Sequence, residues 1–214
     1  LNNAPTVEID YSALHVILAY ADVGIDYWQT TSKDPFDLPV RGVNNPEHCH
    51  DIAKLFLLLS FSASSENKLF RAFRYELDYD KYPYEFPNDV LSELLNNIKE
   101  HHPEISHLIC SGAELRLMNV SSRICDYVIA DFVRTDTPIL TVHDSFIVPI
   151  GYEDRLKQLV KEAFEDVTQK AGIKATYNQS LTKKQLSIHD AQDRDWYFRV
   201  FSWITKGNPT NDYR

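Results

Sequence analysis

Three short segments of the chain have the apolar pattern of β-strands. They are residues 6–10, 139–142 and 146–148, in which Val, Ile and Thr recur, and such runs favour strands. The last two flank His143, Asp144 and Ser145, and Asp and Ser are ordinary turn residues. The pattern therefore predicts a small antiparallel sheet with a hairpin whose tip carries Asp144.

Longer segments carry apolar residues at the spacing of α-helices. Residues 22–46, which contain Pro, Asp and Gly, are expected to connect two of them. Pro83 and Pro87 oppose a helix, so the aromatic segment 75–87 is expected to be a loop. Its aromatic side chains either pin the loop onto the core or stack on bases. The predicted helices are residues 13–21, 46–75 with a polar interruption at 60–65, 89–101, 113–133 and 153–171.

The length of the chain sets its domain organisation. A chain of 214 residues, 43% of them hydrophobic, is long enough for one substantial core. We expect a single domain over residues 1–214, with 46–87 as a helical insertion and 172–214 as a tail that docks on the domain. The tail contains the apolar segment 196–204, which alternatively binds a partner protein.

The chain is acidic, with a formal net charge of −9. This charge weighs against broad, nonspecific binding to phosphates. Any contact with nucleic acid must then be local, and three groups of basic residues are candidates or, alternatively, solvated helix faces. These groups are Lys68, Arg71 and Arg74; Arg116 and Arg123; and Lys183 and Lys184.

The cysteines and the apolar runs bear on the compartment. Cys49, Cys110 and Cys125 are widely separated and lack the spacing of zinc ligands, which indicates free thiols in a reducing compartment. No apolar run approaches the length that spans a bilayer, and the N-terminus lacks the pattern of a leader. We expect a cytoplasmic protein of bacterial or phage context that does not bind membranes.

Two aspartates are the candidate chemical groups. Asp10 ends the strand at 6–10, and Asp144 lies between the other two strands. An ionised carboxylate beside an apolar core is costly unless a cation or hydrogen-bond donors compensate it. If the two converge, their oxygens suit Mg²⁺ and leave positions open for substrate phosphates. Alternatively, each is a plain turn residue.

Three segments together resemble a known family. Residues 10–14 (Asp-Tyr-Ser-Ala-Leu), the helix around Lys54 and residues 142–145 (Val-His-Asp-Ser) occur in the order of motifs A, B and C. These motifs are those of family A DNA polymerases and phage-type single-subunit RNA polymerases. Residues 111–124 also resemble the helix that precedes motif C in that family. The resemblance covers separated blocks between about residues 6 and 149.

The resemblance implies roles for these residues. Asp10 and Asp144 match the aspartates that carry two Mg²⁺ (or Mn²⁺) ions, and the backbone carbonyl of Tyr11 matches a further metal ligand. His143 matches the histidine beside the primer terminus. The helix ahead of motif C lies along the template and primer in the family, and it carries Arg116, Asn119 and Arg123 here.

Motif B departs from the family pattern. The family places a basic residue one turn before the lysine and an aromatic residue two turns after it; these places hold His50 and Ser62 here. The resemblance implies that Lys54 contacts the nucleotide triphosphate as a point charge, with His50 and Ser62 lining the nucleotide site. The alternative is an ordinary amphipathic helix with Lys54 on a solvated face and a core side formed by Leu55, Leu58 and Leu59.

Sugar selection depends on one position. Family members that make DNA have Glu five residues after the motif A aspartate, and this chain has His15 there. An imidazole is bulky enough to crowd a ribose 2′ hydroxyl, but it can also donate a hydrogen bond to that hydroxyl. We therefore favour deoxynucleotides slightly, with His15 in the nucleotide site; packing against the core is the alternative.

Taken together, the sequence predicts an α+β, polymerase palm-like domain: a small antiparallel sheet, helices packed on one face and a reduced helical fingers region. The expected function is template-directed nucleotidyl transfer of DNA polymerase type, with a primase-like enzyme as a variant of it. The expected partners are a primer-template and dNTP or NTP. The alternatives are an RNA-making enzyme, a metal-dependent phosphodiesterase, and an inactive palm that recruits a replication or defence partner. Additional polymerase lobes, or a partner held by the aromatic tail, are further expected partners.

Overall fold

The structure is a computed structural model, and it describes residues 5–11, 13–142, 145–170 and 181–186. Predictions that concern His143, Asp144 or the apolar segment 196–204 lie outside the described residues. In chain order the elements are β1 (Thr6–Tyr11), α1 (Leu14–Asp22), α2 (Tyr27–Thr30), α3 (Pro46–Ser62), α4 (Glu66–Glu76), α5 (Asn88–His101), the 3₁₀ helix η1 (Pro103–Leu108), α6 (Glu114–Arg134), β2 (Leu140–Val142), β3 (Ser145–Pro149), α7 (Glu153–Lys170) and β4 (Leu181–Leu186).

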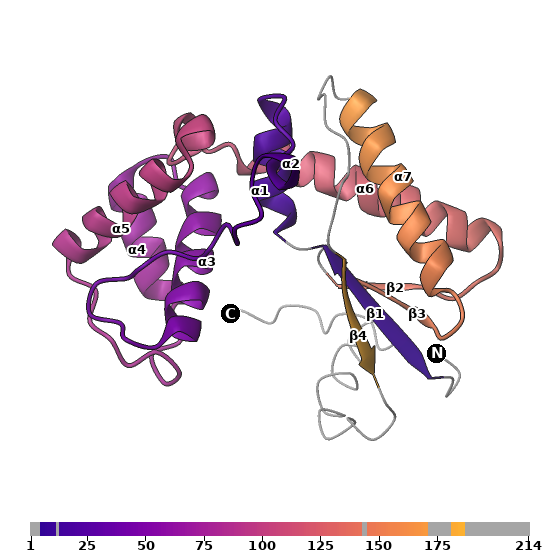
Figure 1. Cartoon of the computed structure of the whole chain (residues 1–214), viewed down its shortest axis with the longest axis horizontal. Coiled ribbons are helices and arrows are strands. Elements are labelled where there is room, and N and C mark those ends of the chain that lie inside the picture. Colours follow the sequence, from indigo (N-terminus) through magenta and orange to yellow (C-terminus); the bar gives the residue numbers. More distant parts are fainter. Residues whose placement is uncertain (1–4, 12, 143–144, 171–180, 187–214) are drawn as a thin grey trace, which may run out of the picture.

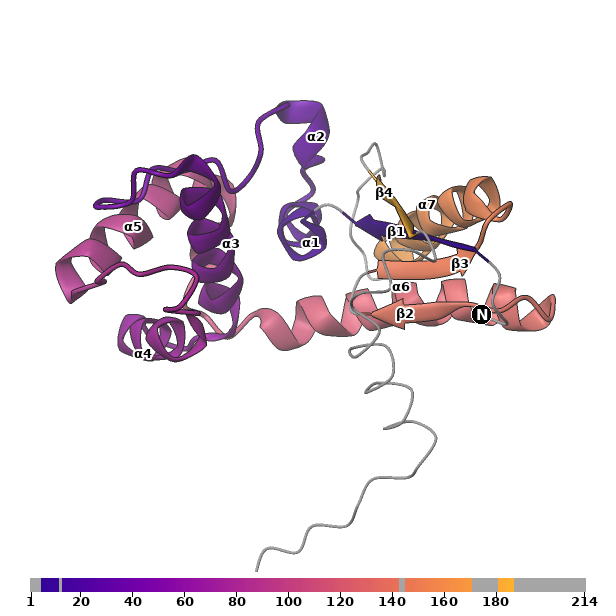
Figure 2. The same cartoon turned by 90° about the horizontal axis from the view of Figure 1, so that it is seen from below.

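The described strands form one antiparallel sheet in the order β2-β3-β1-β4. Side chains alternate along β1, so that Val7, Ile9 and Tyr11 are buried while the residues between them are half-buried. Helices α6 and α7 lie side by side and cover one face of the sheet (Figures 1 and 2). The predicted α+β class is confirmed. Strand β4 lies within the predicted tail, and it extends the sheet along the free edge of β1.

A helical lobe lies beside the sheet. Helices α3, α4 and α5 form it together with η1, at the left of Figure 1. Asn45 and Ser65 cap α3 and α4, because their side-chain oxygens accept hydrogen bonds from backbone N–H groups in the first turn. The lobe contains the predicted insertion 46–87, but it continues through α5 to residue 108.

Aromatic packing holds the loop after α4 onto this lobe. Tyr82 and Phe86 are buried, and the Phe73 ring meets Phe56 and Phe86 edge to face, with centroid distances of 5.2 Å to each. The prediction that the aromatics of segment 75–87 pin it to the core is confirmed for Tyr82 and Phe86.

Helix α1 joins the sheet to the lobe. It begins just after β1 and lies between the two parts of the molecule (Figures 1 and 2). Its Tyr20 hydroxyl lies 3.0 Å from Nδ1 of the fully buried His102. Nε2 of His102 lies 2.9 Å from the carbonyl oxygen of Pro35. A buried polar network therefore connects the helix that follows Asp10 to the C-terminal end of α5.

Two details differ from the sequence prediction. A short helix, α2, interrupts the expected connection 22–46. Asp26 caps it, because its side chain accepts hydrogen bonds from the backbone N–H groups of Trp28 and Gln29. In α3 the fully buried residues include Ile52 and Phe56, while Leu58 is half-buried and outside the core. Leu58 therefore differs from the core side that the alternative, an ordinary amphipathic helix, assigns to it.

The state of the cysteines agrees with what the sequence indicates. Cys49, Cys110 and Cys125 carry free thiols, as predicted. No helix in the described part of the chain has both the length and the apolar character needed to cross a membrane.

Candidate active site on the sheet

Asp10 lies near the end of β1, on the face of the sheet turned away from α6 and α7. Residues 7, 9 and 11 point into the core, so Glu8 and Asp10 share the opposite face, and both are half-buried. In the antiparallel ladder, Asp10 is paired with Ser145 on β3 and Thr182 on β4. The strand-end position predicted for Asp10 is confirmed.

Ser145 is the first residue of β3, and Asp144 precedes it in the sequence. Its side chain is 6% exposed, and its hydroxyl donates a hydrogen bond to Oε1 of Glu8. Asp144 and His143 lie outside the described residues. The expected approach of the Asp10 and Asp144 carboxyl groups to within roughly 3 to 6 Å, set by the spacing of two metal ions, stays a prediction.

The side chain of Tyr11 anchors β1 to the helix layer. Its hydroxyl donates a hydrogen bond to the carbonyl oxygen of Val160 on α7, at 2.7 Å. Its ring meets Phe146 edge to face with 6.2 Å between centroids. This role of the side chain was not predicted from the sequence, since the partner lies 149 positions away. It leaves the proposed role of the backbone carbonyl untested.

The donor atoms on this face suit a hard cation. Carboxylates such as those of Glu8 and Asp10 are the oxygen donors that Mg²⁺ prefers. Within the described residues, no group of three or more His, Cys, Asp or Glu side chains gathers closely enough to hold a metal ion. The described residues thus fit part of a magnesium site, and the second aspartate of the predicted pair is outside them.

His15 lies in the first turn of α1, directly after the strand that carries Asp10. It is half-buried. The buried residues of this helix include both of its neighbours in the sequence, Leu14 and Val16. His15 is therefore held at the border between the core and the surface, close in sequence to Asp10.

The residues of predicted motif B lie on α3, in the helical lobe. The Lys54 ammonium is exposed and lies 5.7 Å from the centroid of the Phe36 ring. His50 lies between two carboxylates: Nε2 is 3.4 Å from Oδ1 of Asp34, and Nδ1 is 3.6 Å from Oδ1 of Asp51. The negative charges of these carboxylates would repel a triphosphate near His50. Lys54, in contrast, forms no ion pair with a described residue.

Ser62, at the aromatic position of motif B, ends α3. Its hydroxyl donates a hydrogen bond to the carbonyl oxygen of Leu59, at 2.9 Å. The side chain is exposed and caps its own helix turn. It offers a nucleotide no aromatic surface.

Helix α6 carries the predicted template and primer contacts. Arg116, Asn119 and Arg123 are exposed and follow one another at helical spacing on one side of the helix. The Arg116 guanidinium donates hydrogen bonds to both carboxylate oxygens of Asp22, at the end of α1. Arg123 forms no ion pair with any residue that the structure describes. Arg116 therefore links α6 to α1, and Arg123 is the more accessible cation.

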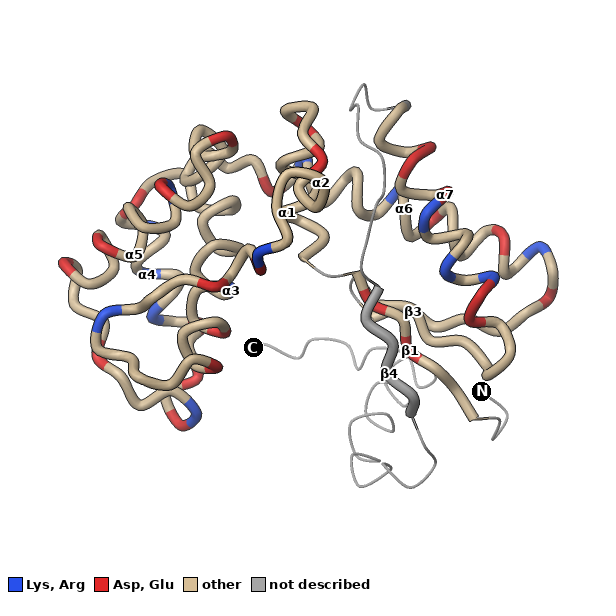
Figure 3. Tube along the Cα trace, viewed as in Figure 1, with Lys and Arg blue, Asp and Glu red and all other residues tan. Residues whose placement is uncertain are grey.

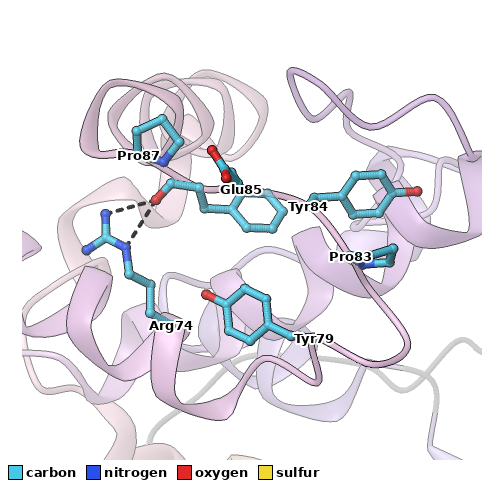
Figure 4. A pocket seen from close by; sticks show the side chains of 7 residues that line it. Arg74, Tyr79, Pro83, Tyr84, Glu85 and Pro87 are labelled. Carbon is cyan, nitrogen blue, oxygen red and sulfur yellow. Dashed lines mark hydrogen bonds between the residues drawn. The ribbon is translucent and has the colours of Figure 1, made fainter.

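A hollow of about 490 Å³ lies away from the sheet, on the helical lobe (Figure 4). The Arg74 guanidinium beside it donates hydrogen bonds to the carbonyl oxygen of Phe86, at 2.9 and 3.1 Å, and to Oδ1 of Asn88. Arg74, predicted as part of a basic patch, is thus committed to holding the loop. The lining residues are Arg74, Tyr79, Pro83, Tyr84, Glu85, Phe86 and Pro87.

Comparisons with known proteins give a fold relationship. No family model and no curated protein matches the sequence. Among solved structures, the chain is similar to the POL domain of Pol1 from M. smegmatis, determined in a complex with a DNA primer-template and dNTP, with a TM-score of 0.50 and 13% sequence identity. The match covers 85% of this chain and 40% of that one. At this identity the similarity shows a shared fold, that of a polymerase domain.

Proposed function

We propose that the protein is a nucleotidyltransferase of DNA polymerase type, which extends a primer along a template. The observation that carries this proposal is the β1–β3 register, in which Asp10 is paired with Ser145, the residue that follows Asp144. The polymerase fold of the solved neighbour and its complex with primer-template and dNTP support the same partners here.

In this function Asp10 and Asp144 would hold Mg²⁺ or Mn²⁺, with the backbone carbonyl of Tyr11. The metal ions, when bound, lower the pKa of the attacking 3′ hydroxyl and neutralise the charge of the leaving pyrophosphate. Tyr11 contributes by fixing β1 against α7 through its hydroxyl. The end of the strand that presents Asp10 is thereby held in place.

Other residues take secondary roles in the proposal. Lys54 would contact the triphosphate, because its ammonium is exposed and has no carboxylate partner among the described residues. His50 would contribute less than the resemblance implies, since Asp34 and Asp51 already neutralise it when it is charged. His15 would crowd the sugar 2′ position and favour dNTP. His143 would steady the primer end.

The test is Mg²⁺-dependent incorporation of nucleotides on a primed template. We expect the unmodified chain to extend the primer with the complementary nucleotide, and Asp10→Asn to lower the rate by orders of magnitude, because one metal-binding charge is lost. Circular dichroism and the melting temperature of the variant should be close to those of the unmodified chain. Thr6→Ala, on the same face of β1, is the matched control.

Two outcomes would contradict the proposal. An Asp10→Asn variant that extends primers normally would remove the metal role of this residue. An unmodified chain that binds the primer-template but never extends it, with or without Mn²⁺, would favour the inactive palm that recruits a partner.

A further inference from the structure

Strand β1 places two carboxylates on one face. Glu8 and Asp10 are two positions apart and both half-buried, on the side of the sheet turned away from α6 and α7. Like charges so close repel each other, and partial burial makes each charge more costly. A strand that served packing alone would gain from a neutral residue at position 8. The half-buried Glu8 carboxylate therefore needs a hydrogen-bond donor.

The partner of Glu8 is on the neighbouring strand. Glu8 is paired in the ladder with Ile147, yet its Oε1 accepts the hydrogen bond of the Ser145 hydroxyl, two positions towards Asp10. Ser145 is almost completely buried and is itself the ladder partner of Asp10. The contact therefore runs diagonally across the sheet, to the end where Asp10 lies.

The chemistry of this contact fixes the orientation of the serine. A carboxylate accepts hydrogen bonds and cannot donate them, so the single hydroxyl proton of Ser145 is committed to Glu8. A hydrogen bond to an ionised acceptor is also stronger than one between neutral groups. The start of β3 is thereby tied to β1 by a side-chain bond as well as by the backbone ladder.

We propose that Glu8 is a positioning residue of the active site: through the Ser145 hydroxyl it fixes the start of β3 relative to Asp10. The inference rests on the proposed function. It assigns Glu8 no direct contact with the metal ions or the nucleotide. Partners of this kind around metal ligands typically change metal affinity or activity about 10- to 100-fold when they are removed.

The experiment compares Glu8→Ala, Glu8→Gln and Ser145→Ala in the full chain. We expect Glu8→Ala and Ser145→Ala each to lower kcat about 10- to 100-fold and to weaken Mn²⁺ binding, followed by electron paramagnetic resonance without nucleotide, by a similar factor. The KM for nucleotide should stay nearly constant. The double variant should resemble either single variant, because both remove the same bond.

The conservative variant gives the distinguishing result. Glu8→Gln keeps an oxygen that accepts the Ser145 hydrogen bond, so we expect it to retain most of kcat and of the Mn²⁺ affinity. Thr6→Ala, on the same face of β1, is the matched control and should leave both unchanged. Melting temperatures measured for all variants separate positioning from loss of fold.

Three results would overturn the inference. The first is a lower melting temperature in Glu8→Ala and Ser145→Ala with unchanged kcat and Mn²⁺ affinity, which would limit the pair to holding the sheet. The second is that Glu8→Gln loses as much kcat and Mn²⁺ affinity as Glu8→Ala does, while Ser145→Ala behaves as the unmodified chain. This result would make Glu8 a direct charged ligand. The third is that Glu8→Ala and Ser145→Ala keep their kcat and Mn²⁺ affinity while Asp10→Asn is inactive. This result would not contradict the proposed function.

Failure of the proposed function has a different signature. It appears as an active Asp10→Asn or as an unmodified chain without incorporation. In that case only the Mn²⁺ titrations test the inference. If the unmodified chain, Glu8→Ala and Ser145→Ala bind Mn²⁺ with equal affinity, the inference is overturned.

Discussion

At the scale of single residues, His102 shows how burial sets protonation. It is fully buried, and its Nε2 must donate to the Pro35 carbonyl oxygen because a carbonyl can only accept. In the neutral ring Nδ1 then accepts from the Tyr20 hydroxyl. Burial lowers the pKa of His102 below its usual 6.5; the Pro35 bond raises it, the neighbouring His101 lowers it and Glu104 raises it. The folded protein therefore holds the neutral form.

This lowered pKa predicts a pH-dependent stability. As the pH falls through 6.5, the unfolded chain takes up a proton on His102 before the folded chain does, so the free energy of unfolding decreases. The pKa of His101 is also lowered by burial and adds to the same trend. The pKa of Tyr27, raised to about 12 by burial, lies outside this window.

The variant His102→Gln tests this prediction by urea unfolding between about pH 5 and 8. We expect it to be less stable near pH 7.5, by about 1–3 kcal/mol, because the two buried hydrogen bonds are imperfectly replaced. The free energy of unfolding of this variant should also decrease less between about pH 7.5 and pH 5 than that of the unmodified chain. His107→Gln changes an exposed histidine and is the control. An undiminished decline in His102→Gln would show that His102 is protonated equally in both states.

The residue scale also shows what the sequence could and could not predict. The strand pattern at residues 6–10 predicted Asp10 at a strand end, and its alternation already places Glu8 on the face of Asp10. The Glu8–Ser145 bond spans 137 positions and the Tyr20–His102 contact spans 82. Such contacts depend on strand register and helix packing, which no local pattern specifies. The carboxylate at position 8 was the available signal for the first.

At the scale of elements, local pattern predicted the helices well because capping and periodicity act within a few residues. Ser65 caps α4 at the polar interruption predicted between residues 60 and 65, and the later helices begin and end within one or two residues of their predicted bounds. The side of α3 that faces the core was less predictable. Helix α3 packs against both α4 and α6, so its buried surface is set by two neighbours, and Leu58 stays half-buried.

Helix α3 also carries a functional prediction. If Lys54 contacts the triphosphate, Lys54→Ala should raise the KM for nucleotide and lower kcat/KM about 10- to 100-fold, which corresponds to the loss of one charge-assisted hydrogen bond. Primer-extension kinetics at varied nucleotide concentration measure this. Lys161→Ala is the control, because Lys161 is an exposed lysine on α7 outside the candidate basic groups. Equal kinetics in the two variants would assign α3 to scaffolding.

At the scale of the whole molecule, side-chain contacts of α1 link the helical lobe to the helices that cover the sheet. The Tyr20–His102 contact joins α1 to the end of α5, and the Arg116–Asp22 pair joins α6 to the end of α1. Both contacts lie on the helix that follows Asp10, so the geometry at the end of β1 is linked to the helical lobe. Acidic residues are spread over both parts of the described molecule (Figure 3), which agrees with the net charge of −9. The proposed binding to a nucleic acid would therefore depend on a few local cations.

This leads to a prediction about salt. Each phosphate neutralised on a DNA duplex adds about −0.9 to the slope of log affinity against log salt concentration. If α6 lies along the primer-template, Arg123→Ala should weaken binding and make the slope shallower by about 0.9. Arg116→Ala should instead lower the free energy of unfolding slightly, by about 0.2–1 kcal/mol, because its ion pair with Asp22 is largely exposed to solvent. Fluorescence anisotropy between about 50 and 200 mM salt measures the slopes. Lys161→Ala removes an equal charge from the exposed side of α7, and equal slopes for it and Arg123→Ala would place the nucleic acid elsewhere.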